Sequence, residues 1–70
     1  MIQIDQIRFR LQETIRNSGL SQTELAKRLE IKQQTIAAYL SGKALPSLDT
    51  FANLCNILNI EPSYILCIKE

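Results

Sequence analysis

Histidine is absent from this 70-residue sequence, and cysteine, glycine and proline occur only twice each. Histidine is the side chain that most often serves as a general acid or base in enzymes. The sequence also offers no plausible nucleophile–base pair, no paired carboxylates in an apolar setting and no glycine-rich loop for a phosphate. These absences argue against an enzyme and give no reason to expect a cofactor.

Long apolar runs and metal-ligand patterns are missing as well. No stretch reaches the roughly 18 apolar residues of a membrane-spanning helix, and Asp5, Arg8 and Arg10 interrupt the first residues, unlike a signal peptide. Cys55 and Cys67 stand among apolar residues without metal-type spacing or a histidine partner. We therefore expect free thiols, no metal site, no membrane contact and a cytoplasmic location.

Helical signals recur along the whole chain, whose length fits one domain over residues 1–70. Apolar residues at three- and four-residue spacing, separated by capping residues and by glycine or proline, predict five short helices. The expected ranges are about 5–17, 22–29, 33–41, 48–58 and 62–66. Strand-like alternation and internal repeats are absent, so the predicted fold class is all-α.

The helix ends and buried faces follow from the same patterns. Asp5, Ser21 and Ser47 are the expected N-caps, and Gly19 and Gly42 supply left-handed stops. In the first helix, the expected buried residues are Ile4, Ile7, Leu11 and Ile15. In the fourth helix, they are Leu48, Phe51, Ala52, Leu54, Cys55 and Leu58.

The stretch 21–43 carries the most specific local pattern. SQTE at its start predicts a capping box, with Ser21 as the cap and Glu24 three residues later. The apolar period breaks near Glu30 and restarts at Gln33, so two short helices are joined by a tight turn. The second helix directs Ile36, Tyr39 and Leu40 inward and leaves amide and small side chains outside. This arrangement is typical of a helix-turn-helix.

Charge is unevenly distributed, although the net charge is only +1. Residues 1–43 hold seven basic and four acidic side chains, a net charge of +3, whereas residues 44–70 hold one basic and three acidic side chains, a net charge of −2. A basic front half suits a protein that presents one end to phosphates. Small domains often show such an imbalance by chance, so this signal is weak alone.

The run from Gly19 to Leu66 contains LSQTELA, then QQTI, then YLSGKALPSLDTFANLCNILNI. In this order and spacing, these motifs resemble the Cro/repressor-type helix-turn-helix family, the λ-repressor-like DNA-binding domains of the xenobiotic-response-element regulators. The resemblance implies a sequence-specific transcriptional regulator, in particular a repressor, of bacterial, phage or mobile-element origin and associated with the nucleoid. Double-stranded DNA is the implied partner.

The resemblance also assigns roles to individual residues. The positions matching the family's base-reading side chains on the third helix are Lys32, Gln33, Gln34, Ala37 and Ala38. Glutamine can bond adenine N6 and N7, Lys32 either reads guanine or contacts phosphate, and Ala37 and Ala38 offer methyl groups to thymine. The implied phosphate-binding residues are Gln22, Thr23, Thr35, Tyr39, Ser41, Gly42 through its amide, Lys43 and Arg10. A methyl contact with thymine is the alternative for Thr35.

Plainer interpretations stay open for several of these residues. The two glutamines could be solvated residues at a helix start, Lys27 and Arg28 form an exposed face, and Tyr39 is a half-buried packing residue.

Three positions depart from the family pattern. Family members often carry an Arg–Glu ion pair where this chain has Ile15 and Leu40, so we predict an apolar contact between these two residues. Glu30 replaces the frequent glycine of the turn, at a cost of about 1 kcal/mol if φ is positive. Ala38 replaces a charged or amide residue, which weakens the case for narrow base specificity.

A domain this small gains affinity by binding DNA as a symmetric dimer. The expected homodimer surface is the helix 4–helix 5 end, where apolar side chains are frequent: Ile57, Ile60, Tyr64, Ile65 and Ile68. Two alternatives remain: an antitoxin-like protein whose main ligand is another protein, and a helical interaction module that does not bind DNA.

Overall fold

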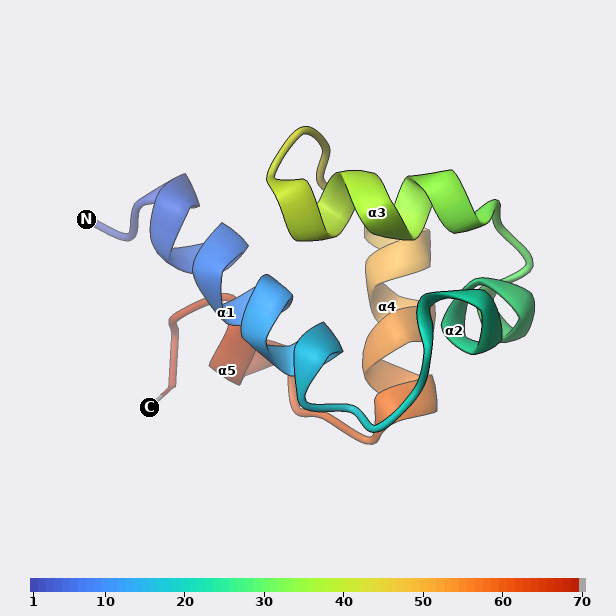
Figure 1. Ribbon diagram of the computed structural model, residues 1–70. Helices are drawn as coiled ribbons and strands as arrows, with labels where there is room; N and C mark the ends of the chain where they lie inside the picture. Colours follow the sequence, from blue (N-terminus) through green and yellow to red (C-terminus); the bar gives the residue numbers. More distant parts are fainter. Residues whose placement is uncertain (70) are drawn as a thin grey trace.

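The computed structural model describes residues 1–69 and confirms an all-α fold of five helices (Figure 1). The helices are α1 (Ile4–Arg16), α2 (Gln22–Leu29), α3 (Gln33–Ser41), α4 (Leu48–Leu58) and α5 (Pro62–Ile65). Within the described residues, none of these helices is long and apolar enough to cross a membrane.

The core takes one fully buried aliphatic side chain from every helix. These side chains are Leu11, Leu25, Ile36, Leu54 and Ile65. Around them α2 and α3 pack on each other, α1 contacts both α3 and α5, and α2 contacts α4. In Figure 1, α3 lies along one side of the molecule, with α1 near its C-terminal end and α2 near its N-terminal end. The core therefore supports α3 from below and leaves its outer face open.

The first helix begins one residue earlier than predicted, at Ile4, and Asp5 is not its N-cap. Gln3 occupies the N-cap, and its backbone N–H donates to the side-chain oxygen of Gln6 at 3.2 Å. Asp5 instead lies in the first turn and pairs with Arg8 at 2.6 Å. Leu11 and Ile15 are buried as expected, but Ile4 is 51% exposed because the helix projects beyond the core at this end.

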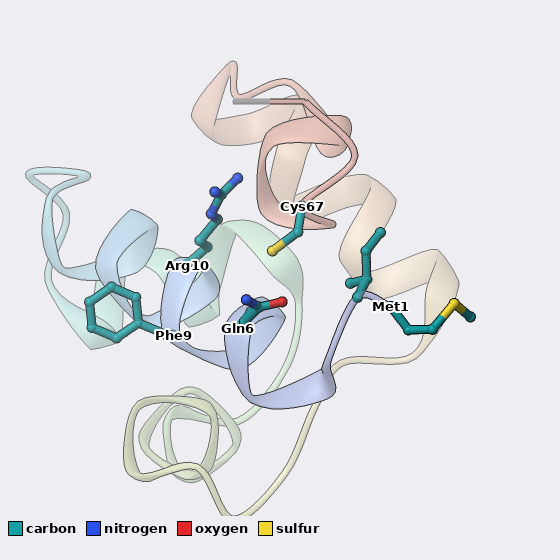
Figure 2. A pocket seen from close by; sticks show the side chains of 6 residues that line it. Met1, Gln6, Phe9, Arg10 and Cys67 are labelled. Atoms are coloured by element: carbon teal, nitrogen blue, oxygen red, sulfur yellow. The ribbon is translucent and has the colours of Figure 1, made fainter.

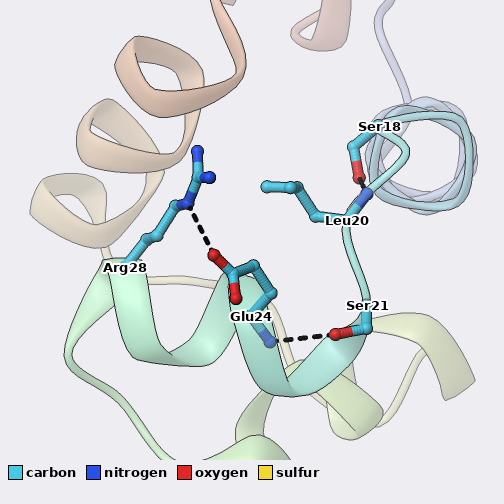
Figure 3. Close-up of polar contacts among 5 residues, drawn as sticks. All are labelled: Ser18, Leu20, Ser21, Glu24 and Arg28. Carbon is cyan, nitrogen blue, oxygen red and sulfur yellow. Dashed lines mark hydrogen bonds and ion pairs between the residues drawn. The ribbon is translucent and has the colours of Figure 1, made fainter.

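The start of α2 shows half of the predicted capping box (Figure 3). The Ser21 hydroxyl accepts a hydrogen bond from the Glu24 backbone N–H at 3.1 Å. The Glu24 carboxylate does not return to Ser21; it accepts from Arg28 Nε at 3.3 Å, one turn further along α2. Ser18 fixes the preceding turn, since its hydroxyl donates to the Ile15 carbonyl and accepts from the Leu20 N–H. Ser21 thus caps α2 as predicted.

The turn between α2 and α3 is held by a non-glycine residue in the left-handed region. Glu30 has φ 57°, and the next residue, Ile31, donates its N–H to the Ala26 carbonyl at 3.0 Å. The departure from glycine therefore does not alter the turn; the chain accepts the backbone strain instead, typically about 1 kcal/mol or more for a non-glycine residue.

We expect Glu30→Gly to stabilise the domain. Glycine relieves the left-handed strain, and the gain exceeds the entropy that glycine adds to the unfolded chain. With ~1–2 kcal/mol of strain relieved and ~0.4–1 kcal/mol of chain entropy added, the free energy of unfolding should rise by up to about 1 kcal/mol in urea titrations. The matched control is Glu13→Gly within α1, where φ is helical and glycine should destabilise by about 1 kcal/mol. A loss of stability in Glu30→Gly would contradict the strain.

The fourth helix is predicted correctly in range but not in all its contacts. Ser47 is the N-cap residue, yet its hydroxyl donates to the Asp49 carboxylate and does not accept from a helix N–H. The Ser47 hydroxyl and the Thr50 N–H hold the pKa of Asp49 below its usual value. Leu54 and Cys55 are buried as expected, whereas Leu48 is 86% exposed and Ala52 is also exposed.

Candidate nucleic-acid interface

Two adjacent glutamines stand at the exposed start of α3. Gln33 and Gln34 are both exposed, as is Ala37 one turn later, and together with Gln22 of α2 they line a shallow hollow. Neither glutamine is covered by another part of the described chain, residues 1–69. The geometry required of a base-reading helix tip is therefore present.

A hydrogen bond across the helix-turn-helix orients the first glutamine. The Thr23 hydroxyl, in the first turn of α2, donates to Gln33 Oε1 at 3.1 Å. This bond fixes which end of the amide is the acceptor, and the second lone pair of Oε1 and both Nε2 protons stay available. Gln33 therefore presents an acceptor and a donor side by side, the pair that matches adenine N6 and N7.

The start of α2 offers backbone donors beside this glutamine. Ser21 accepts from Glu24, but the amides of Gln22 and Thr23 have no acceptor among the described residues. Free amides at a helix N-terminus, together with the helix dipole, favour an anion. Gln22 is exposed at the same place, so this end of α2 can bind a phosphate.

The middle of α3 divides between surface and core. Ala37 is exposed, Ala38 and Thr35 are half-buried, and Ile36 is fully buried. Tyr39 is only 4% exposed, and burial, followed by the nearby Asp49 carboxylate, raises the pKa of its hydroxyl. Tyr39 is thus a packing residue, as one interpretation expected, but it is buried in the core and not half-buried, which leaves little of its side chain for a phosphate.

At the end of α3, helix carbonyls accept hydrogen bonds from the backbone N–H groups that follow the helix. Gly42 has φ 82°; its N–H donates to the Tyr39 carbonyl, and the Lys43 N–H donates to the Ala38 carbonyl. The Gly42 amide is thus already used by the helix cap, which corrects its predicted role as a phosphate donor. Ser41 and Lys43 are exposed on either side of it. The Ser41 hydroxyl also donates to the Ala38 carbonyl, at 3.2 Å, so it must rotate to reach a phosphate, and the Lys43 side chain is the more available candidate at this end of α3.

Arg10 lies away from this surface. Its Nη1 donates to the Tyr64 carbonyl at 2.7 Å and to the Lys69 carbonyl at 3.1 Å, and its guanidinium stacks 4.7 Å from the Tyr64 ring centroid. Figure 2 shows the side chain extending from α1 toward the segment that carries Cys67. The predicted phosphate contact of Arg10 is corrected: the residue ties α1 to the last turn of the chain.

Two polar residues of α1 were missed by sequence reasoning, although they contact the end of α3. Gln12 Nε2 donates to the Leu40 carbonyl at 3.2 Å. Arg8 Cδ lies 3.2 Å from the position that a Cβ on Gly42 would occupy. Their i, i+4 spacing places Arg8 and Gln12 on one face of α1. Nothing in the sequence shows that this face meets residues about thirty positions later.

Ile15 and Leu40, the two apolar residues at the positions of the family's ion pair, both pack in or against the core. Ile15 is buried in the core, and Leu40 is partly buried against the same core cluster. Neither residue is solvated, and their direct contact stays a prediction. Cys55 and Cys67 are free thiols; Cys55 is buried as expected, which raises its pKa, whereas Cys67 is only half-buried.

The fold and this surface define an all-helical helix-turn-helix domain. The helix-turn-helix family model of the Cro/C1 type matches residues 11–65. The chain belongs to the Cro/repressor-type helix-turn-helix family, which confirms the resemblance seen in its motifs. It is a DNA-binding regulatory domain of a family that is not one of enzymes. No match was found among curated proteins or among solved structures.

Proposed function

We propose that this protein is a sequence-specific transcriptional repressor that inserts α3 into the major groove of DNA. The observation that carries the proposal is the exposed Gln33–Gln34 pair at the N-terminal tip of α3, in a domain of a DNA-binding family. An α-helix fits the major groove, where each base pair presents a distinct pattern of donors and acceptors. Binding across a promoter would exclude polymerase, which makes repression the simplest regulatory outcome.

The base contacts are assigned by chemistry. Gln33, oriented by Thr23, reads adenine, and Gln34 bonds the edge of the neighbouring base pair. Lys32 is exposed just before them and contacts guanine or phosphate, while Ala37 and the half-buried Ala38 offer methyl groups to thymine. With two alanines in mid-helix, most of the discrimination rests on the glutamines.

The phosphate contacts lie at both ends of the helix-turn-helix. Gln22 and the free amides of α2 bind one phosphate, with the Thr23 backbone contributing its N–H. Ser41 and Lys43 bind a phosphate at the far end of α3, and Thr35 contributes a hydroxyl or a methyl group near the groove. These contacts set the register of α3 and carry no sequence information of their own.

A homodimer through the α5 end completes the proposal, with a changed set of contact residues. Ile65 is fully buried in the core and cannot serve, and Ile57 and Ile60 are half-buried. Tyr64 and Ile68 are 42% and 71% exposed. Two such subunits would read half-sites roughly 34 Å apart on a pseudo-palindrome.

The first test measures binding to duplex DNA as a function of salt, followed by selection from random duplexes. If α3 and α2 bind through phosphates, log K should fall linearly with log salt, with a slope of about −0.9 for each phosphate neutralised. The basic side chains among the proposed contacts are Lys43 and Lys32, so the slope should be about −0.9 per subunit if Lys32 contacts guanine and about −1.8 if it contacts a phosphate. Selection should enrich a palindromic motif. Salt-independent binding, or no enriched motif, would contradict the proposed function.

A protein partner is the second candidate ligand, as in an antitoxin. The observation in its favour is an apolar groove lined by α1, α5, the start of α4 and the loop that precedes α4. The exposed side chains of Ile4, Leu45 and Leu48 border it. None of the residues that line this groove is among those proposed here to contact DNA. Absence of DNA binding in the salt experiment would favour the protein partner.

A further inference from the structure

Arg8 presents an unexplained feature next to the end of α3. Its Nε is buried and finds no hydrogen-bond acceptor among residues 1–69. Buried polar groups are almost always paired, so an orphan donor on a charged side chain calls for an explanation. The guanidinium is not isolated, because its Nη1 pairs with the Asp5 carboxylate at 2.6 Å.

The position of this side chain is set by α3. The Arg8 stem lies on Gly42, with Cδ 3.2 Å and Nε 3.8 Å from the site where a Cβ would be. Gln12, one turn further along α1, anchors the same end of α3 through the Leu40 carbonyl. Arg8 is therefore held beside the exposed Ser41 and Lys43, while its side chain keeps 29% of its surface exposed.

The length of α3 indicates what Arg8 can reach. Nine residues at ~1.5 Å each make α3 about 13 Å long, close to the major-groove width of ~12 Å. In the proposed complex, the start of α2 binds a phosphate on one side of the groove. The C-terminal end of α3 then lies near the phosphates on the other side of the groove. Arg8 lies at that end.

We propose that Arg8 is a further phosphate-binding residue and that the Asp5 carboxylate pairs with the Arg8 guanidinium until DNA binds. The inference rests on the proposed function, since it assumes that α3 enters the groove. Once Asp5 lets go, the guanidinium can turn outward from Gly42, and a phosphate would then accept a two-pronged hydrogen bond from Nε and one Nη, which gives the buried, unpaired Nε of the free protein a partner. The Asp5 carboxylate is 87% exposed and releases the guanidinium into water at little cost.

The experiment is a double-mutant cycle on DNA binding against salt. Arg8→Met keeps the apolar stem on Gly42 and removes the charge, so the salt slope should weaken by about 0.9 and affinity at 0.1 M salt should fall roughly eightfold. Asp5→Asn should raise affinity, and this gain should disappear in the Arg8→Met background. Arg8→Lys, which keeps the charge without the fork, should recover the slope but only part of the affinity.

The chain supplies a matched control on the same helix. Arg16 pairs with Glu13 at 3.5 Å, with the same three-residue spacing as Arg8 and Asp5 but at the other end of α1. Arg16→Met and Glu13→Gln should leave the slope and the coupling unchanged. Thermal melting without DNA shows whether each variant is folded at the assay temperature.

The outcomes separate the two proposals. If the wild-type protein shows no salt-dependent binding, the proposed function fails. If it binds and folded Arg8→Met retains the wild-type slope, the role of Arg8 alone is overturned. If Asp5→Asn raises DNA affinity equally in the wild-type and Arg8→Met backgrounds, the effect is one of overall charge. The proposal that Asp5 pairs with Arg8 until DNA binds would then be overturned.

Discussion

Replacing Gln33 and Gln34 together with alanine should remove most of the discrimination among DNA sequences while leaving salt-dependent binding in place. Both side chains are exposed at the start of α3, where only base edges lie within reach in the proposed complex. Each bidentate contact discriminates by ~1–3 kcal/mol, so the pair should account for about 2–6 kcal/mol. Phosphate contacts from α2 and from the end of α3 are untouched by the substitutions, so non-specific affinity should persist.

The measurement compares the variant on the selected duplex and on a scrambled duplex of the same length at one salt concentration. The wild-type preference should fall by the ~2–6 kcal/mol attributed to the two glutamines, leaving only the remainder supplied by Lys32, Ala37 and Ala38, and the salt slope should stay within error of the wild-type value. Gln6→Ala is the matched control, since Gln6 lies on α1 beside Met1 and Cys67 (Figure 2). An equal loss of affinity for both duplexes would contradict base reading by the glutamines.

Features set by neighbouring residues could be predicted from the sequence. Ser21 caps α2, Gly42 ends α3 and Pro62 begins α5, because each acts on backbone groups within four residues of itself. The exposure of Gln33 and Gln34 followed from the period of α3 in the same way. Such signals need no knowledge of the tertiary structure, and they were sufficient for the fold and the tip of the candidate site.

Features set by distant residues could not be predicted. Arg10 and Arg8 are both arginines near the start of α1, and only the packing of α1 decides that Arg10 meets the carbonyls of residues 64 and 69 while Arg8 meets Gly42. The family resemblance pointed to Arg10 as the basic residue near DNA. Our proposal gives that role to Arg8, which lies two positions earlier, on a different face of the helix and beside Gly42.

Short helices also limit what can be predicted from the sequence, because they give too few residues to define a buried face. α5 has four residues, so its apolar side chains do not define a face by periodicity. Ile65 was assigned to the dimer surface but is fully buried, whereas Ile68 beyond the helix is exposed. Similarly, Leu48 begins α4 and fits its apolar period, yet it lies outside the core because the helix start projects from it.

The largest effect on stability should come from Ile36→Ala. Ile36 is the fully buried aliphatic residue of α3 and packs with the fully buried side chains of the other four helices. Removing three carbons leaves a cavity beneath the recognition helix and should cost about 2–5 kcal/mol. A domain of this length has a total stability of only about 4–10 kcal/mol, so the substitution removes a large part of it.

Thermal and urea unfolding measure this effect directly. At about 4–8 °C for each kcal/mol, Tm should fall by at least roughly 8 °C, and DNA binding should weaken at temperatures where the variant unfolds. The matched control is Ile2→Ala: Ile2 is 50% exposed before α1, so the same change of side chain should alter the unfolding free energy by no more than about 0.5 kcal/mol. Equal destabilisation by the two variants would mean that the open face of α3 is not supported by the core, and the interface built on that face would have no rigid base.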